Sequence, residues 1–320
     1  MKKSIFLSFI LCLCLVACIP QQAMAQKQSR MEKLLRYLND NDADKWQKNR
    51  EKLDDETKAY YAEDLSLMDV LNDLWNGQSE QAATLYFGCY EKAAQNNFPS
   101  ICEGEKIPLS QIRDKADQSI INLLEASKDK IPFSRALLDS IHATEYPVDS
   151  AMLQRLQNIR EVALLEGMLK APTPIIYQTY VKEYPNGKFI AQVNASENVR
   201  LYQLVKTAPT PANFKAFFED PEMQKYYQDR GPRPYLAEVR TLYDDFLFQR
   251  IDSLKKEGNA TAIRQIIDDY KNTPYLSTGA RTHLNDLEYL SEKADFELLK
   301  PAIVNSESLG LLQEFLKTHK

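Results

Sequence analysis

The stretch APTPIIYQTYVKEYPNGKFI, from Ala171 to Ile190, decides the fold because the chain repeats its pattern. A second copy, APTPANFKAFFEDP, runs from Ala208 to Pro221, and a third, GNATAIRQIIDDYKNTPYL, from Gly258 to Leu276. A fourth, SLGLLQEFLKTHK, begins at Ser308. Internal repeats with a period of about 20 to 50 residues are typical of stacked supersecondary units. They predict an all-α protein, an α-α superhelix of helical hairpins.

Each copy has the chemistry of a short helix. Thr173 before Pro174 puts a hydroxyl N-cap ahead of a proline at the first helical position, where a missing N–H costs nothing. Thr210 before Pro211 does the same in the second copy. Apolar side chains three and four residues apart then form stripes that must be buried, namely Tyr177, Tyr180, Val181 and Tyr184 in copy one and Phe214, Phe217 and Phe218 in copy two.

Four residues are predicted to occupy the same buried position in successive copies. Each follows a cap-like polar residue by seven positions and precedes an apolar neighbour, which places it in the middle of its stripe. These equivalent residues are Tyr180, Phe217, Ile266 and Phe315.

The second copy carries nine extra residues between Phe217 and Tyr235, in a segment rich in aromatic residues and prolines. Insertions at hairpin tips often carry the binding surface of a solenoid, although an idle loop is the plainer interpretation. Tyr226 and Tyr227 belong to no helical stripe. They are therefore the candidate partner contacts of this segment.

Acidic residues recur at the same place in successive short helices. Stacking of the repeats would align Glu183, Asp220 and Asp269 into a ridge. One interpretation is a contact surface for a cationic partner. The other is the ordinary solvated side of each helix.

Composition supports helices and excludes one class of partner. The chain has 320 residues, of which 44% are hydrophobic and only nine are glycine, so turn chemistry is too scarce for a sheet protein. Its 45 acidic residues exceed its 40 basic ones, which gives a net charge of -5. No basic patch argues for nucleic acid.

The N-terminus is typical of an exported protein. Lys2-Lys3 precedes an apolar run from Ile5 to Ala17 that is too short to span a bilayer. Cleavage after Ala25 would make residues 1–25 a signal peptide. In the alternative, Cys18 belongs to a lipobox, and its lipid would be the chain's membrane anchor. Both alternatives predict a periplasmic or outer-membrane-associated protein.

The remaining chain is predicted to hold two helical parts. Residues 26–170 contain less regular helical hairpins, either worn repeats of the same superhelix or a separate cap, and residues 171–320 contain the regular repeats. Cleavage after Ala25 would leave Cys89 and Cys102 as the only cysteines. They can form a disulfide in an oxidising compartment, or remain two unpaired buried thiols.

The run from Tyr177 to Phe189, YQTYVKEYPNGKF, resembles the tetratricopeptide-like repeats of exported Bacteroidota envelope proteins. The resemblance covers roughly Pro132 to Lys320. The Trp, Leu-Gly, Tyr and Ala pattern of a full tetratricopeptide is absent. The resemblance implies a helical-repeat surface that binds another protein.

The common catalytic motifs are missing from the sequence. The sequence has no Gly-rich phosphate loop, H-E-x-x-H, paired C-x-x-C or G-x-S-x-G, so we predict no enzyme, no cofactor and no metal site.

The leading hypothesis is a non-catalytic scaffold that binds an envelope protein. Glycan binding is a second hypothesis and would need exposed aromatic rings such as Trp46 and Trp75. A lytic-transglycosylase-like enzyme is a third and would need an isolated carboxylic acid in a cleft.

Overall fold

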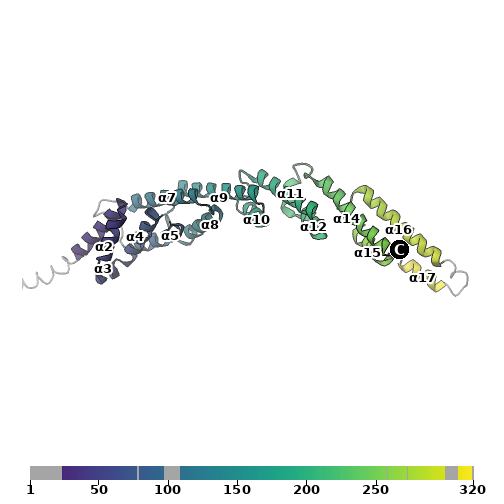
Figure 1. Cartoon of the computed structure of the whole chain (residues 1–320), viewed down its shortest axis with the longest axis horizontal. Coiled ribbons are helices and arrows are strands. Elements are labelled where there is room, and N and C mark those ends of the chain that lie inside the picture. The colour runs from purple at the N-terminus through teal and green to yellow at the C-terminus, as the bar shows by residue number, and fades with distance from the viewer. Residues whose placement is uncertain are drawn as a thin grey trace, which may run out of the picture. The chain divides into compact units, whose positions relative to one another are not determined.

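A computed structural model describes residues 24–77, 79–96, 109–257, 259–271, 273–299 and 309–318 (Figure 1). Over these residues the regular structure is helical, and no strand is present. The all-α prediction is therefore confirmed, while the superhelical stacking of the repeats stays a prediction. The chain divides into two compact units, one ending at Glu166 and the other beginning at Gly167.

Unit 1 is a cluster of helices in which α4 packs against α5 and α7, and α5 also packs against α7 and α8. After a first helical stretch at residues 24–39, its helices are α2 (Ala43–Glu51), α3 (Asp55–Tyr60), α4 (Ala62–Trp75), α5 (Glu80–Gln95), α7 (Leu109–Ala126), α8 (Lys130–Ala143) and the greater part of α9 (Ser150–Lys170).

The core of unit 1 includes an apolar stripe whose spacing of three and four residues predicts one buried helix face. The stripe of the first helical stretch is fully buried, and Trp46 and Leu53 join it from α2 and the segment after it. Asp42 and Asp54 cap α2 and α3 by accepting backbone N–H groups of Lys45 and Thr57. The stripe residues of the first stretch are Met31, Leu34, Leu35 and Leu38.

The spacing of Ala82, Leu85, Tyr86 and Cys89 predicts one buried stripe on the helix over residues 80–94, but Leu85 is 51% exposed and this position is wrong. The buried face of α5 instead includes Phe87 and Tyr90, whose large rings pack around Tyr146 at 4.8 and 5.1 Å between ring centroids. The buried face of α5 is therefore shifted by about one residue from the predicted stripe, toward these aromatic side chains, and Leu85 lies outside it.

The helices of unit 2 pack mainly on neighbours in the chain: α11 packs against α10, α12, α13 and α14, then α14 against α15, α15 against α16, and α16 against α17. Its helices are α10 (Pro174–Glu183), α11 (Ile190–Thr207), α12 (Pro211–Glu219), α13 (Pro221–Tyr227), α14 (Leu236–Lys256), α15 (Ala260–Tyr270), α16 (Thr278–Leu299) and α17 (Leu309–Thr318).

The predicted helix starts of unit 2 are confirmed. Thr173 accepts a hydrogen bond from Ile176 N, and Thr210 accepts one from Asn213 N, each with proline in the first turn. Asn259 caps the third copy in the same way. Local sequence therefore fixes where these helices begin.

The predicted equivalent positions are buried in three copies. Tyr180, Phe217 and Ile266 are at most 4% exposed. The Tyr180 hydroxyl also accepts a hydrogen bond from Phe189 N at 3.1 Å, so this tyrosine satisfies its polar end inside the hairpin. In the fourth copy, Phe315 is only half-buried.

Candidate functional site

The insertion in the second copy folds as a short helix and a return loop. Asp220 caps α13 by accepting Met223 N at 2.8 Å, Pro221 stands in the first turn, and Met223 is fully buried. On the other side, Gln224 Nε2 donates to the carbonyl of Phe218 at 2.8 Å. The segment is therefore packed onto the rest of unit 2.

The return loop uses two unusual backbone conformations. Gly231 has a φ of 99°, a region that side chains disfavour, and no atom lies within 4 Å of where its Cβ would be. Tyr235 has a φ of 63° and stacks on the ring of Tyr202, with centroids 4.3 Å apart. The stacking holds the loop where α14 begins.

Arg233 fastens the return loop to the neighbouring helices. Its Nε donates to Asn198 Oδ1 at 2.7 Å, and its Nη1 donates to the carbonyl of Phe217. The guanidinium carbon lies 3.9 Å from the centroid of the Phe217 ring. Burial lowers the pKa of Arg233, and the nearby Asp220 opposes this shift. In return, Asn198 Nδ2 donates to the carbonyl of Pro234 at 3.2 Å.

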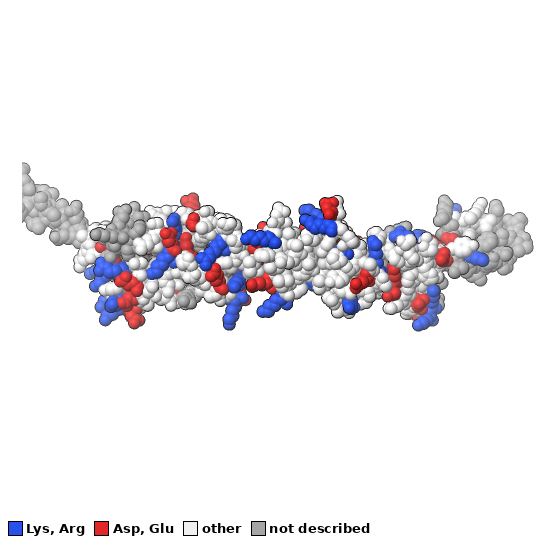
Figure 2. All heavy atoms as spheres, turned by 90° about the horizontal axis from the view of Figure 1, so that it is seen from above, with Lys and Arg blue, Asp and Glu red and all other residues white. Residues whose placement is uncertain are grey.

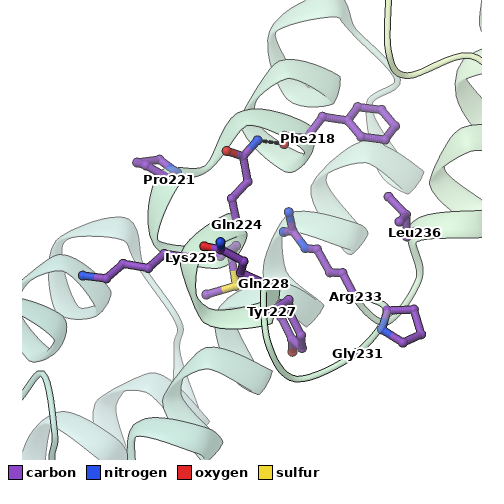
Figure 3. A pocket seen from close by; sticks show the side chains of 11 residues that line it. Phe218, Pro221, Gln224, Lys225, Tyr227, Gln228, Gly231, Arg233 and Leu236 are labelled. Atoms are coloured by element: carbon purple, nitrogen blue, oxygen red, sulfur yellow. Dashed lines mark hydrogen bonds between the residues drawn. The ribbon is translucent and has the colours of Figure 1, made fainter.

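A pocket of about 680 Å³ lies between α13 and the return loop (Figure 3). We call it the insertion pocket. Apolar side chains and proline rings form most of its wall. Its lining comprises Phe218, Pro221, Met223, Gln224, Lys225, Tyr227, Gln228, Gly231, Pro232, Arg233 and Leu236.

The structure separates the two candidate tyrosines by role. Tyr227 lines the insertion pocket and is half-buried, and burial raises the pKa of its hydroxyl. Tyr226 packs edge-to-face on Tyr227, with ring centroids 5.0 Å apart, and lies under the guanidinium of Arg230 at 4.4 Å. Tyr226 therefore packs against a lining residue and is not itself part of the lining.

The three acidic candidates lie in different surroundings. Glu183 is half-buried at the end of α10, Asp220 caps α13, and the exposed Asp269 accepts a hydrogen bond from Gln265 at 2.8 Å. Figure 2 shows basic and acidic side chains interspersed on its visible face. The proposed acidic ridge stays a prediction, and the pocket is the better-defined feature.

Another pocket, of about 470 Å³, lies in unit 1 between α7 and the start of α9. We call it the aspartate pocket. Asp117 lies in its wall with 8% exposure and accepts a hydrogen bond from the Tyr146 hydroxyl. Burial raises the pKa of Asp117 to about 6, against the lowering effects of Tyr146 and Arg113. A carboxyl with such a pKa can release or take a proton near neutral pH. The lining comprises Arg113, Asp114, Asp117, Gln118, Ile121, Asp149, Ala151, Met152 and Arg155.

Known proteins add nothing to this geometry. No family model, curated protein or solved structure matches the chain.

Other features bear on cofactors and membranes. Within the described residues, no group of three or more His, Cys, Asp or Glu side chains is placed to hold a metal ion. None of the described helices has the length and apolar character needed to cross a bilayer. Of the predicted signal peptide, residues 1–23 lie outside the described residues. The lipidation candidate Cys18 is among them.

The cysteine and tryptophan candidates fare differently. Cys89 is half-buried and its Sγ lies 3.5 Å from Ser66 Oγ, while Cys102 lies outside the described residues, so the disulfide stays a prediction. Trp46 is 3% exposed. The ammonium of Lys115 lies 3.9 Å from the centroid of the Trp75 ring. Trp46 therefore offers no ring face for a sugar, and one face of Trp75 is covered.

Sequence reasoning missed Arg233 and the helix α13. The start of α13 had a readable signal, because Asp220-Pro221 repeats the cap-then-proline chemistry of Thr173-Pro174. Arg233 had none. Its partners, Asn198 and Phe217, lie 35 and 16 residues away along the chain, and only the fold brings them together.

Proposed function

We propose that the chain is an exported, non-catalytic interaction protein that binds another protein of the cell envelope through the insertion pocket. The observation that carries the proposal is the pocket itself, an open surface pocket whose wall contains Tyr227, Phe218 and Arg233. Tyrosine and arginine in well-packed pockets are the residues that most often dominate protein–protein binding energy. The leader-like N-terminus supports export, and the repeat pattern supports a scaffold role.

The pocket also has the rigidity that a recognition site needs. Phe218 is 9% exposed and stacks on Tyr275, with ring centroids 4.3 Å apart and an angle of 6° between ring planes. Arg233 is held by two hydrogen bonds, and Met223 is fully buried. A partner would meet side chains already in place, which reduces the entropy lost on binding.

Photo-crosslinking in the native envelope tests the proposal. A photoreactive residue replaces Gln228, which is exposed on the pocket lining, and in a matched strain it replaces Gln249, which is exposed on α14. We expect one defined protein adduct from position 228 and none of that mass from position 249. Absence of an adduct at 228, or the same adducts from both positions, would overturn the proposal.

A second candidate function rests on Asp117. A buried carboxyl with a raised pKa in the wall of a pocket is the feature that a lytic-transglycosylase-like enzyme would require. Release of soluble fragments from purified peptidoglycan by the wild-type chain, and its loss in Asp117→Asn, would favour this candidate. Equal release by both proteins, or none by the wild type, would rule it out.

A further inference from the structure

The insertion pocket has a charge pattern unlike that of the whole chain. The chain carries more acids than bases and has a net charge of -5. The lining of the pocket contains two cationic residues, Lys225 and Arg233, and no acidic one. An entering group therefore meets positive charge of the protein and no carboxylate in the pocket wall.

Arg233 has hydrogen-bonding capacity that the fold leaves unused. Its Nε and Nη1 donate to Asn198 and Phe217, but its Nη2 is buried without an acceptor among the described residues. Leaving a charged donor buried and unpaired is unfavourable, so an acceptor that reached this nitrogen, which solvent does not contact in the unbound chain, would be stabilising. Among protein groups, a carboxylate matches a guanidinium best, because it is anionic and its oxygens fit the planar fork.

Two acids that act on Arg233 are already committed elsewhere. Asp220 raises the pKa of Arg233, but its carboxylate caps α13 and it is not part of the lining. Glu197 also raises the pKa of Arg233, but it forms an ion pair with Arg200 at 2.6 Å and is 1% exposed. These residues stabilise the guanidinium charge without filling the pocket.

The rest of the wall selects for an apolar neighbour. Phe218, Met223 and Leu236 line the pocket with the rings of Pro221 and Pro232. A volume of about 680 Å³ lies within the usual range of roughly 300 to 1,000 Å³ for ligand pockets. Figure 3 shows Lys225 extending outward, away from Arg233, so the two cations lie on different parts of the pocket.

We propose that the insertion pocket binds an acidic segment of the partner protein, in which a carboxylate adjoins a large apolar side chain. Arg233 would donate a hydrogen bond to the carboxylate, the apolar wall would contact the neighbouring side chain, and Lys225 would attract acidic residues that flank them. This inference rests on the proposed function and adds the chemistry of the partner's segment.

Selection from a displayed library of random twelve-residue peptides tests the inference on the full-length mature chain. We expect enriched peptides to carry Asp or Glu beside Leu, Ile, Met or Phe, and their affinity to fall as salt rises. Because Lys225 is exposed, Lys225→Glu reverses charge at the pocket without removing a core contact and should weaken these peptides by at least about fivefold. Lys215→Glu, an exposed lysine on α12 outside the lining, is the matched control and should weaken them by less than about twofold.

Other outcomes would overturn the inference. They are enrichment of neutral or basic peptides, failure to enrich any peptide on the wild-type chain, and equal effects of the two lysine reversals. Crosslinking from position 228 distinguishes the two levels. An adduct there together with any of these results would leave the interaction function standing and remove only the acidic-segment inference.

Discussion

The guanidinium carbon of Arg233 lies 3.9 Å from the centroid of the Phe217 ring, and Arg233 also donates a hydrogen bond to the carbonyl of the same residue. Phe217 is a fully buried position of α12, and Arg233 belongs to the insertion. The wall of the pocket is thus attached directly to the core of unit 2. Changes in that core are expected to reach the pocket.

Removing the Arg233 contacts should destabilise unit 2. Arg233→Met loses two hydrogen bonds and the cation–π contact, so we expect the free energy of unfolding to fall by about 2 to 4 kcal/mol in urea titrations. Arg233→Lys keeps the charge but loses the planar fork of the guanidinium, so its free energy of unfolding should lie between those of Arg233→Met and the wild type. Arg230→Met is the control. Its guanidinium lies over the half-buried Tyr226 and should cost no more than about 1 kcal/mol. Equal losses at the two arginines would contradict the anchoring role of Arg233.

Truncating Phe217 should have a larger effect. Phe217→Ala leaves a cavity in a fully buried site and should cost about 3 to 5 kcal/mol. Lys215→Ala, at an exposed position of the same helix, should change stability by no more than about 0.5 kcal/mol. Chemical denaturation of both variants checks the difference. Small and similar effects would mean that the stripe of α12 is not the core of its repeat.

The fold was predictable where local chemistry decides it. Thr173, Thr210 and Asn259 cap their helices because a polar side chain beside the first turn is a local signal. Leu85 was misplaced because the face of α5 is chosen by Tyr146, which comes from another part of the chain. Arg233 was invisible for the same reason. Contacts between distant segments leave no trace in the spacing of residues.

The Tyr146 hydroxyl should control the protonation of Asp117. Its hydrogen bond stabilises the charged carboxylate and lowers the pKa, partly opposing the effect of burial. In Tyr146→Phe the pKa of Asp117 should therefore rise above about 6, as measured by carboxyl ¹³C chemical shifts across a pH series. Tyr86→Phe is the control, because the Tyr86 hydroxyl lies 3.4 Å from that of Tyr146 and leaves the bond to Asp117 in place. A fall in the pKa of Asp117 in Tyr146→Phe would refute this assignment.

Export should remove residues 1–25 and leave Gln26 as the new terminus. The expectation rests on Ala23-Met24-Ala25, which puts small residues at the third and the first positions before the cut. Intact-mass measurement of the protein from its native envelope tests it. A mature chain that starts at a lipidated Cys18 would contradict the expectation and place the protein on a membrane surface.

Buried Asp64 should make the stability of unit 1 depend on pH. This α4 residue is 2% exposed, and its Oδ1 has no hydrogen-bond partner among the described residues. Burial, with a smaller contribution from neighbouring Glu63, raises the pKa of Asp64 to about 7, from 3.8 for an ordinary aspartate. The pKa of Tyr61 is raised by burial and, in turn, by Asp64. Both causes that act on Asp64, burial and Glu63, raise its pKa.

The direction of the pH effect follows from the two protonation states. Below pH 3.8 the carboxyl is protonated in both the folded and the unfolded chain. In this range its ionisation takes nothing from the free energy of unfolding. Between pH 3.8 and about 7 the unfolded chain has released the proton while the folded chain keeps it, so stability falls as pH rises. One such group contributes a slope of at most about 1.4 kcal/mol per pH unit. Urea midpoints measured from pH 4 to 8 should therefore decline in the wild type and decline less in Asp64→Asn. If Asp64→Asn keeps the wild-type slope, the carboxyl is not protonated in the folded core.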